Sequence, residues 1–402
     1  MWQWAGRRIA ALAVAWAVAA AAMAQQKSWR EPGPFYRWQE ALPERAGVLL
    51  RSQPLEPELM LAQAASGLRI LYTSKGHTDE VVPVSGMVFL PRGEAPEGGW
   101  PVLAWAHGTT GIADRCAPSL NPASERDAAF LNHWLQAGYA LVATDYEGLG
   151  TPGPQPYLHC ASEAYSIIHS VQAARELALP LTREWVAMGQ SQGGHGALCA
   201  AAHAGLRAEE LGFLGALATA PAIHFMERLS QGHPSTPDPF IGLTLMMARG
   251  FEAYSPSFSI EQVFNSRARA LLQVVDRSCV QQVIEAGAEL GLTSGDSLKV
   301  LPFSEAPGVA EAAKHQEIPL RGWSALPVYL AQGTGDRMVS PGEVVRFSEQ
   351  LCEQGARLNL DLYPRAGHSG PMIQGLQAFE EWVAARFAGE AAPSHCGDPG
   401  HY

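Results

Sequence analysis

The pattern with the most chemical content is Gly189-Gln190-Ser191-Gln192-Gly193, the one G-x-S-x-G in the chain. It follows an apolar run, 185–188, and precedes a helical pattern of small residues, 192–204. A serine between a strand and a helix lies on a turn so sharp that the residues two positions away must be small, here Gly189 and Gly193. Such a turn holds the hydroxyl clear of the backbone, and the helix N-terminus behind it favours negative charge. We therefore predict that Ser191 is a nucleophile.

A serine hydroxyl needs a general base, and the base needs an acidic group that orients it. Asp336 follows the strand pattern 328–331, and His368 follows the strand pattern 358–363. Both are thus expected in loops at the carboxyl ends of parallel strands, where sheets build their sites. We predict that His368 is the base and Asp336 its partner. Four competing groups are placed less well: Asp361 inside a strand pattern, His315 in an irregular region, and His395 and His401 in the tail.

Acyl transfer also requires N–H donors for the oxyanion of the tetrahedral intermediate. The residue after the nucleophile supplies one such donor, which here is the backbone N–H of Gln192. The second donor is expected in the loop His107–Gly111, because this loop follows the strand pattern 102–106. We predict the N–H of Thr109, with Gly108 as the alternative donor.

Two segments are weaker candidates for contact with a substrate. Asp145–Gly150 follows the strand pattern 139–144 and contains Tyr146; its carboxylates can touch substrate, but a role in structuring the loop is favoured. The apolar segment 240–248 can line a pocket, with Met247 and Phe251 near its end, or form a buried helix. We predict substrate contacts for Tyr146, Met247 and Phe251.

Strand and helix patterns alternate through most of the chain, which indicates an α/β fold with a mainly parallel sheet and helices on both faces. We expect an N-terminal arm and the first part of this core over 25–223, and the second part with a C-terminal tail over 325–402. The alternation fails over 224–324, which we interpret as an inserted, mostly helical cap. The expected strands are 68–73, 81–90, 102–106, 139–144, 185–188, 213–219, 328–331 and 358–363, and the expected helices are 124–137, 163–179, 192–204, 260–275, 280–290, 341–354 and 372–387.

The first 24 residues are typical of a secretory signal peptide. Arg7 and Arg8 precede an apolar run, 9–22, and Ala22 and Ala24 are the small residues of a cleavage site. The run is short for a membrane span, although an uncleaved anchor is the alternative. We predict cleavage after Ala24 and a periplasmic or secreted protein.

Export makes the six cysteines candidates for disulfides, since oxidising compartments allow them. Six cysteines allow 15 pairings. We predict Cys352–Cys396, which would join the tail to a helix, and Cys116–Cys160, which would join two loops. Cys199 lies in a helix of small residues and can be a buried thiol.

The formal net charge of −11 argues against nucleic acid as a partner, because phosphate binding needs clustered Lys and Arg. The chain has no C-x-x-C, and the serine chemistry requires neither a metal nor a cofactor. The expected partner is an ester, small or lipid, with transient lipid contact through the cap. The oligomeric state stays open.

Five segments together resemble the secretory lipase family of α/β-hydrolases. They are HGTTG at 107–111, DYEGLGTPGPQPYL at 145–158, GQSQGGHG at 189–196, GTGDRMVSP at 333–341 and AGHSG at 366–370. The resemblance covers about 68–223 and 325–388 and does not extend to the cap. It implies an α/β-hydrolase fold with an inserted cap, and carboxylic ester hydrolysis with Ser191, Asp336 and His368 as the triad.

Other functions of the same fold remain open. A serine aminopeptidase or an acyltransferase would use the same triad with another bond or another acceptor. A peptidase would need acidic residues aimed at the site, for which Glu252, Glu261 and Glu305 are available. A non-catalytic binding protein on this fold is disfavoured, because all three triad positions are occupied.

Overall fold

The computed structural model describes residues 29–224, 240–300 and 302–397. It divides into two units, 1–30 and 31–402, and the description below concerns the second. The predicted signal peptide, 1–24, lies outside the described residues. No helix among the described residues combines the length and the apolar character needed to cross a bilayer.

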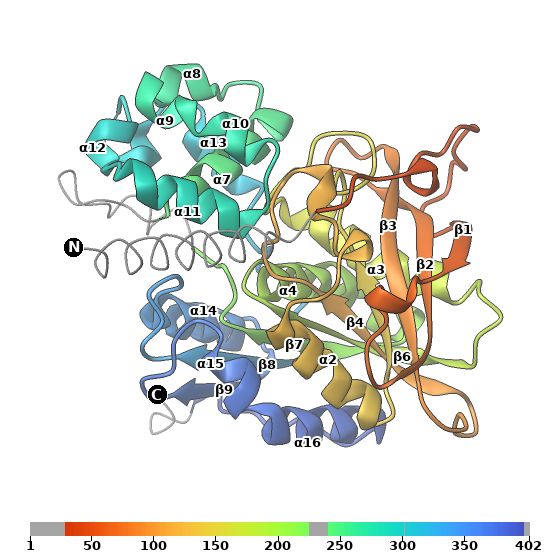
Figure 1. Ribbon diagram of the computed structural model, residues 1–402. Helices are drawn as coiled ribbons and strands as arrows, with labels where there is room; N and C mark the ends of the chain where they lie inside the picture. Colours follow the sequence, from red (N-terminus) through yellow and green to blue (C-terminus); the bar gives the residue numbers. More distant parts are fainter. Residues whose placement is uncertain (1–28, 225–239, 301, 398–402) are drawn as a thin grey trace, which may run out of the picture. The chain divides into compact units, whose positions relative to one another are not determined.

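The described strands form one sheet of nine in the order β1-β2-β3-β5-β4-β6-β7-β8-β9 (Figure 1). The pairs β1–β2, β2–β3 and β3–β5 are antiparallel, and every pair from β5 to β9 is parallel. The loops after the parallel strands therefore open at a common edge. The strands are β1 Leu49–Pro54, β2 Ala64–Lys75, β3 Val81–Pro91, β4 Trp100–Ala106, β5 Ala140–Thr144, β6 Leu181–Gln190, β7 Phe213–Thr219, β8 Pro327–Gly333 and β9 Arg357–Tyr363.

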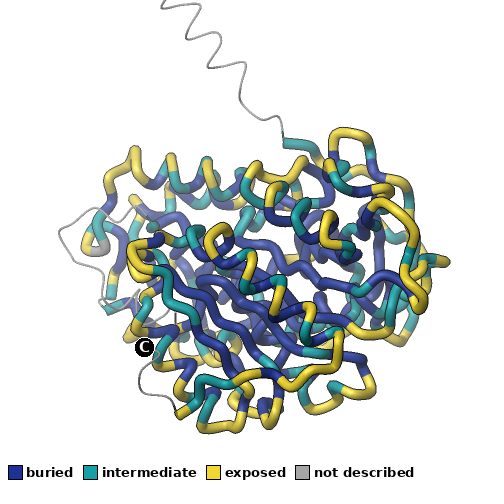
Figure 2. Tube along the Cα trace, turned by 90° about the horizontal axis from the view of Figure 1, so that it is seen from below, coloured by how far each residue is buried: buried dark blue, intermediate teal, exposed yellow. Residues whose placement is uncertain are grey.

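The sheet is covered on both faces, and its central strands are buried on both sides (Figure 2). Along β4 the side chains alternate between the two cores: Ala104 and Ala106 contact one, and Leu103 and Trp105 the other. Helices α3, α4 and α14 pack on the first face, and α2 and α16 on the second. The helices outside the insertion described next are α2 Glu125–Gln136, α3 Cys160–Ala174, α4 Gln192–Ala204, α5 Ala208–Leu211, α14 Pro341–Glu353, α15 Gly370–Gln374 and α16 Leu376–Phe387.

Between β7 and β8 the described chain is helical; we call residues 240–323 (except 301) the helical insertion. It has its own hydrophobic core, and most of the buried residues of α7 belong to this core. The expected helix 280–290 matches α11, whereas the expected helix 260–275 is broken into three, with Asn265 capping the second. The helices are α7 Ile241–Tyr254, α8 Ile260–Val263, α9 Ser266–Ala270, α10 Leu272–Val275, α11 Val280–Leu290, α12 Ser294–Ser297 and α13 Val309–Lys314.

The N-terminal arm contributes a strand that the sequence pattern did not predict. β1 pairs with β2 at the edge of the sheet, and its burial alternates only at its end. The 3₁₀ turns of the described chain are η1 Pro34–Tyr36, η2 Pro57–Leu59, η3 Asp114–Cys116, η4 Pro118–Leu120, η5 Gly205–Arg207 and η6 Phe303–Glu305.

Candidate active site

Ser191 occupies the turn between β6 and α4 in a strained conformation. Its φ is 59° and its ψ is −119°, outside the regions that L-residues prefer. Three backbone hydrogen bonds hold it there. Ser191 donates its N–H to the carbonyl of Thr219 at 3.0 Å, and its own carbonyl accepts from His195 and Ala222, each at 3.0 Å. A turn this closely determined keeps the Ser191 side chain in one place, as the sharp-turn interpretation requires.

The two glycines that flank the serine have no room for a side chain. A Cβ on Gly189 would lie 2.1 Å from the carbonyl oxygen of Gly193, and one on Gly193 would lie 1.8 Å from that of Ala106. Both distances are far inside van der Waals contact. The turn thus packs its backbone directly against the end of β4.

Asp336 lies in the loop after β8 and is fixed by several donors. Its Oδ1 accepts from the backbone N–H of Met338 at 2.7 Å and of Val339 at 3.1 Å. Its Oδ2 accepts from the side-chain amide of Gln332 at 3.1 Å. Burial alone would raise the pKa of Asp336, but the hydrogen bond and charge of His368 and the two N–H groups outweigh it and lower the pKa below 3.8. The carboxylate is therefore ionised at neutral pH.

His368 lies in the loop after β9 and contacts this carboxylate. Its Nδ1 is 2.8 Å from Oδ2 of Asp336. Its backbone carbonyl accepts from the side chain of Gln190 at 3.4 Å, which joins the loop to the residue before Ser191. Its other ring nitrogen, Nε2, is buried and has no hydrogen-bond partner among the described residues. The structure thus brings His368 and Asp336 together and leaves one nitrogen unused.

The loop His107–Gly111 lies beside the nucleophile turn. A Cβ on Gly108 would stand 3.8 Å from Cβ of Ser191, so the two backbones are close neighbours. Tyr146 donates its hydroxyl to the carbonyl of His107 at 3.0 Å. The hydroxyl groups of Thr109 and Tyr157 form a hydrogen bond of 2.6 Å between their oxygens. The predicted oxyanion donors, Thr109 and Gln192, thus lie on adjacent segments at the same edge of the sheet.

The helical insertion contacts this loop directly. Val280 donates its N–H to the carbonyl of Thr110 at 2.8 Å, and Gly111 forms an antiparallel bridge with Cys279. A disulfide between Cys116 and Cys279 fixes the same junction. The start of α11 is therefore attached to the loop that neighbours Ser191.

The disulfides differ in part from the sequence-based pairing. The structure contains the expected Cys352–Cys396 bond. The expected Cys116–Cys160 bond is wrong, because Cys116 pairs with Cys279 and Cys160 pairs with Cys199. Cys199 is thus no free thiol. Cys160 and Cys199 with His195 are also the one grouping of metal-ligand type among the described residues, but both sulfurs are engaged in the disulfide.

The three predicted substrate contacts are buried elsewhere. Tyr146 is 2% exposed and lies behind the His107 loop, where its ring packs against His107. Met247 and Phe251 are fully buried in the core of the insertion. The expectation that these side chains face an open pocket therefore finds no geometric support, because helix packing within the insertion takes up the apolar segment.

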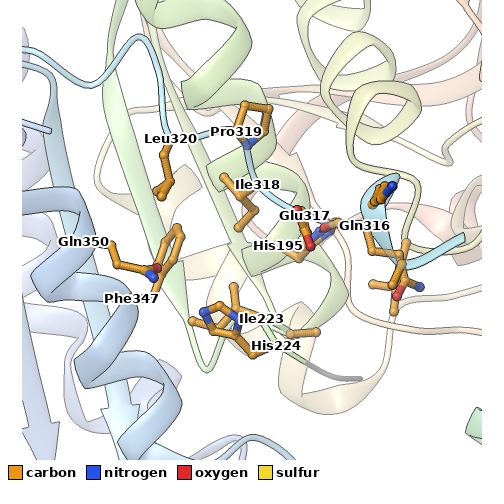
Figure 3. A pocket seen from close by; sticks show the side chains of 14 residues that line it. His195, Ile223, His224, Gln316, Glu317, Ile318, Pro319, Leu320, Phe347 and Gln350 are labelled. Atoms are coloured by element: carbon orange, nitrogen blue, oxygen red, sulfur yellow. The ribbon is translucent and has the colours of Figure 1, made fainter. Parts of the chain in front are cut away.

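A cavity of about 710 Å³ lies next to the turn (Figure 3). Ala222, which hydrogen-bonds the carbonyl of Ser191, lines it, and so does His195, one helical turn beyond the serine. None of Ser191, Asp336 and His368 is a lining residue. Its described walls are Leu158, His195, Ala222, Ile223, His224, Ala313, Lys314, Gln316, Glu317, Ile318, Pro319, Leu320, Phe347 and Gln350.

The competing residues have other partners. Asp361 accepts from the hydroxyls of Tyr329 and Tyr363. The His315 ring stacks on His159, and Nδ1 of His395 accepts from the backbone N–H of Leu360 at 3.3 Å. His401 lies outside the described residues. None of the three acidic residues considered for a peptidase, Glu252, Glu261 and Glu305, lines the cavity.

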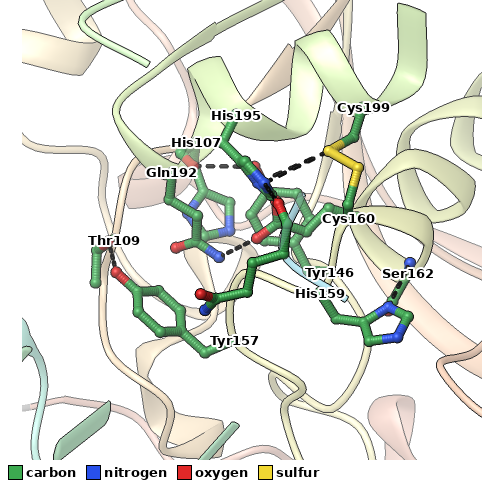
Figure 4. A network of polar contacts seen from close by, with 12 residues as sticks. His107, Thr109, Tyr146, Tyr157, His159, Cys160, Ser162, Gln192, His195 and Cys199 are labelled. Atoms are coloured by element: carbon green, nitrogen blue, oxygen red, sulfur yellow. Dashed lines mark hydrogen bonds and ion pairs between the residues drawn. A yellow bond between two sulfur atoms is a disulfide. The ribbon is translucent and has the colours of Figure 1, made fainter. Parts of the chain in front are cut away.

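Sequence reasoning missed a buried polar cluster next to the turn. It contains Gln192 and His195, both labelled in Figure 4, and the carboxylate of Glu163. Glu163 is the one acidic residue of α3, within an otherwise apolar and small-residue pattern. A lone carboxylate on a helix expected to be buried is the signal that could have found it, since such groups are buried only when paired.

The chain is similar to known secretory lipases. The secretory lipase family model matches residues 119–395, which is more than half of the chain. Lipase A of Moesziomyces aphidis is 23% identical over 392 residues, covering 91% of this chain and 82% of that protein.

Two solved structures share the fold at low sequence identity. Candida antarctica lipase A in its closed state is 19% identical with a TM-score of 0.76, covering 91% of this chain and 88% of that one. The rice cell wall degrading esterase LipA of Xanthomonas oryzae is 20% identical with a TM-score of 0.66, covering 85% of this chain and 98% of that one. The sheet and its helices thus form an α/β-hydrolase fold, and the chain belongs to the secretory lipase family of ester-hydrolysing enzymes.

Proposed function

We propose that the protein is an exported serine carboxylic-ester hydrolase that acts through an acyl intermediate on Ser191. The observation that carries this proposal is the pair His368–Asp336, with the His368 loop joined to Gln190 and with Nε2 of His368 buried and without a partner among the residues that the structure describes. A base in that state accepts a proton from a neighbouring hydroxyl once a substrate completes the site.

In the proposed reaction Ser191 Oγ attacks the ester carbonyl carbon while His368 Nε2 takes its proton. Asp336 accepts from Nδ1–H, which fixes the ring tautomer and stabilises the imidazolium that forms. The N–H groups of Gln192 and Thr109 donate to the oxyanion. The imidazolium then protonates the leaving alkoxide as the C–O bond breaks. Water attacks the acyl-enzyme by the same steps and releases the acid.

We place the acyl or alkyl chain of the ester, the part that does not react, in the cavity of Figure 3. It borders the turn through Ala222, and its walls include Leu158, Ile318, Leu320 and Phe347. Apolar walls favour an acyl or alkyl chain, because burial of each CH₂ contributes about 0.8 kcal/mol. We propose that this cavity, with the insertion acting as a cap, replaces the pocket expected around Met247 and Phe251.

Export is supported by the family and by the disulfides. All six cysteines are paired, which fits an oxidising compartment. N-terminal sequencing of protein recovered from outside the cytoplasm is expected to start at Gln25.

The test of the catalytic proposal compares the wild type with Ser191→Ala on p-nitrophenyl esters from acetyl to palmitoyl. We expect kcat to fall by about 10⁴-fold or more, since the nucleophile is lost. Ser166→Ala is the matched control, because the buried Ser166 hydroxyl has no hydrogen-bond partner in the described part of the chain and its loss should leave kcat unchanged. A fluorophosphonate should add to the peptide containing Ser191 in the wild type alone. An active Ser191→Ala enzyme would refute the proposal.

A further inference from the structure

A buried ion pair lies directly behind the nucleophile turn. Glu163 on α3 and His195 on α4 are 3% and 1% exposed, and Oε2 of Glu163 is 2.7 Å from Nδ1 of His195. The other ring nitrogen, Nε2, is 2.8 Å from the carbonyl of Gln316, where the chain leaves the insertion. Both ring nitrogens face acceptors, an arrangement that favours the doubly protonated ring. Burial would lower the pKa of His195, but the charge and hydrogen bond of Glu163 outweigh it and raise the pKa.

The second oxygen of the same carboxylate reaches the residue next to the nucleophile. Oε1 of Glu163 accepts from the side-chain amide of Gln192 at 2.9 Å, and Gln192 is 1% exposed. Gln192 is the first residue of α4. One carboxylate on α3 therefore binds two side chains in the first turn of α4, those of Gln192 and His195.

This attachment acts on the peptide group that matters for catalysis. Ser191 has a positive φ, a conformation that costs about 1–3 kcal/mol and persists only where its surroundings determine it. Relaxation of that turn would rotate the peptide between Ser191 and Gln192, and with it the N–H of Gln192. A Gln192 side chain bonded to a neighbouring helix opposes this rotation.

We propose that Glu163 is a positioning residue that, through the side chain of Gln192, aims the Gln192 N–H at the oxyanion. The inference rests on the proposed function, since it assigns that N–H to the acyl-transfer transition state. Glu163 does not touch the substrate in this account. It acts through a hydrogen bond, with His195 supplying the cation that makes a buried carboxylate tolerable.

The molecule contains a second buried pair that serves as an internal control. Glu147 is 5% exposed, and its Oε1 lies 2.8 Å from Nδ1 of His77. Its other oxygen accepts from the backbone N–H of His77 and from the hydroxyl of Ser162. Glu147 has no hydrogen bond to the nucleophile turn among those of the described chain. The two pairs thus have the same chemistry and differ in what the carboxylate holds.

The main test is Gln192→Met, which keeps the backbone N–H and the side-chain length but removes the hydrogen bond to Glu163. We expect kcat to fall by about 10–100-fold, less than or comparable to complete loss of an oxyanion donor. KM should change by less than about twofold, because the ground-state ester does not depend on this donor. Inhibition by a trifluoromethyl ketone, which forms a tetrahedral adduct, should weaken by the same factor as kcat/KM.

Variants of Glu163 test the other side of the hydrogen bond. Glu163→Ala should reproduce the loss seen with Gln192→Met. Glu163→Gln should keep kcat within about threefold of the wild type, since its amide oxygen still accepts from Gln192. Glu147→Gln should leave both kcat and ketone inhibition unchanged. Thermal unfolding of each variant shows that a folded enzyme is being compared.

Three outcomes would overturn the inference: wild-type kcat and ketone inhibition in a folded Gln192→Met, no recovery from Glu163→Ala to Glu163→Gln, or an equal loss in Glu147→Gln. Each of these leaves the proposed function standing if Ser191→Ala is inactive. An active Ser191→Ala would instead refute the function itself, whatever the Glu163 variants do.

Discussion

The sheet and the helical insertion place their residues by different physical means. In the sheet, the proposed triad comes from loops after β6, β8 and β9, so backbone pairing between parallel strands places these three loops at one edge of the sheet. The insertion has several short helices around its own apolar core and meets the site through Thr110 and Cys279. Strand pairing tolerates little change at the turn, whereas helix packing has more ways to adjust.

The largest expected effect that tests this difference comes from one added methyl group. Gly193→Ala would put a Cβ 1.8 Å from the carbonyl oxygen of Ala106. Neither β4 nor the turn can move far enough to remove this clash without losing the register of the strands. We expect little folded protein and no labelling by a fluorophosphonate. In the insertion, Gly287→Ala would put a Cβ 3.2 Å from Cγ2 of Ile241 on α7. Gly287 lies in α11, and alanine stabilises a helix by about 1 kcal/mol relative to glycine.

Gly287→Ala should therefore unfold at nearly the temperature of the wild type and keep its activity. Equal damage from both substitutions, measured by thermal unfolding and ester turnover, would show that the insertion is as strictly determined as the sheet.

A smaller effect is expected at the junction of the two regions. Cys116→Ser with Cys279→Ser removes the bond that fixes α11 to the loop beside Ser191. We expect a loss of about 2–4 kcal/mol in the free energy of unfolding and a several-fold fall in kcat, because Thr110 and Gly111 lose their anchor.

The matched control is Cys352→Ser with Cys396→Ser, which removes a disulfide between α14 and the tail. It should lower the unfolding temperature without changing kcat. If both double variants keep full kcat, the insertion contributes stability to the loop but no catalytic positioning.

The smallest expected effect concerns substrate choice. Ile318→Trp adds bulk to the cavity wall supplied by the chain that leaves the insertion. We expect kcat/KM for palmitoyl esters to fall about tenfold relative to acetyl esters, as a filled apolar site loses a few CH₂ contacts. Met247→Ala, in the core of the insertion, should lower stability and leave the ratio between chain lengths unchanged. A shift of that ratio by Met247→Ala alone would return the acyl pocket to the position first predicted.

Much of the α/β core, the sheet with its covering helices, could be predicted because the signals for these elements are local. The expected helix 192–204 coincides with α4, and Ser124 caps α2 by accepting from the N–H of Asp127. The loop positions of Asp336 and His368 follow from the strands before them. α3 was expected from 163 but begins at Cys160, because the ring of His159 accepts from Ser162 and caps the helix, a capping role that residue type alone does not indicate.

The rest depends on contacts between distant segments. Cys116 reaches Cys279 only because the insertion docks on the His107 loop, and no local pattern encodes that docking. The break of 260–275 before α9 is a local exception, because the side chain of Asn265 accepts from the N–H groups of Arg267 and Ala268 and starts a new helix there. Glu163 is explained only by partners on α4 that lie about 30 residues away in the chain.

The Cys116–Cys279 bond also closes a covalent ring that contains Ser191, whereas Asp336 and His368 lie outside it. A single cut of the chain anywhere between the two cysteines leaves both fragments joined, so an enzyme nicked by a protease keeps the proposed triad in one molecule. Such a ring allows one cleavage of the intervening chain without separation of the two fragments. After one cut, separation of the two fragments requires reduction of the Cys116–Cys279 bond.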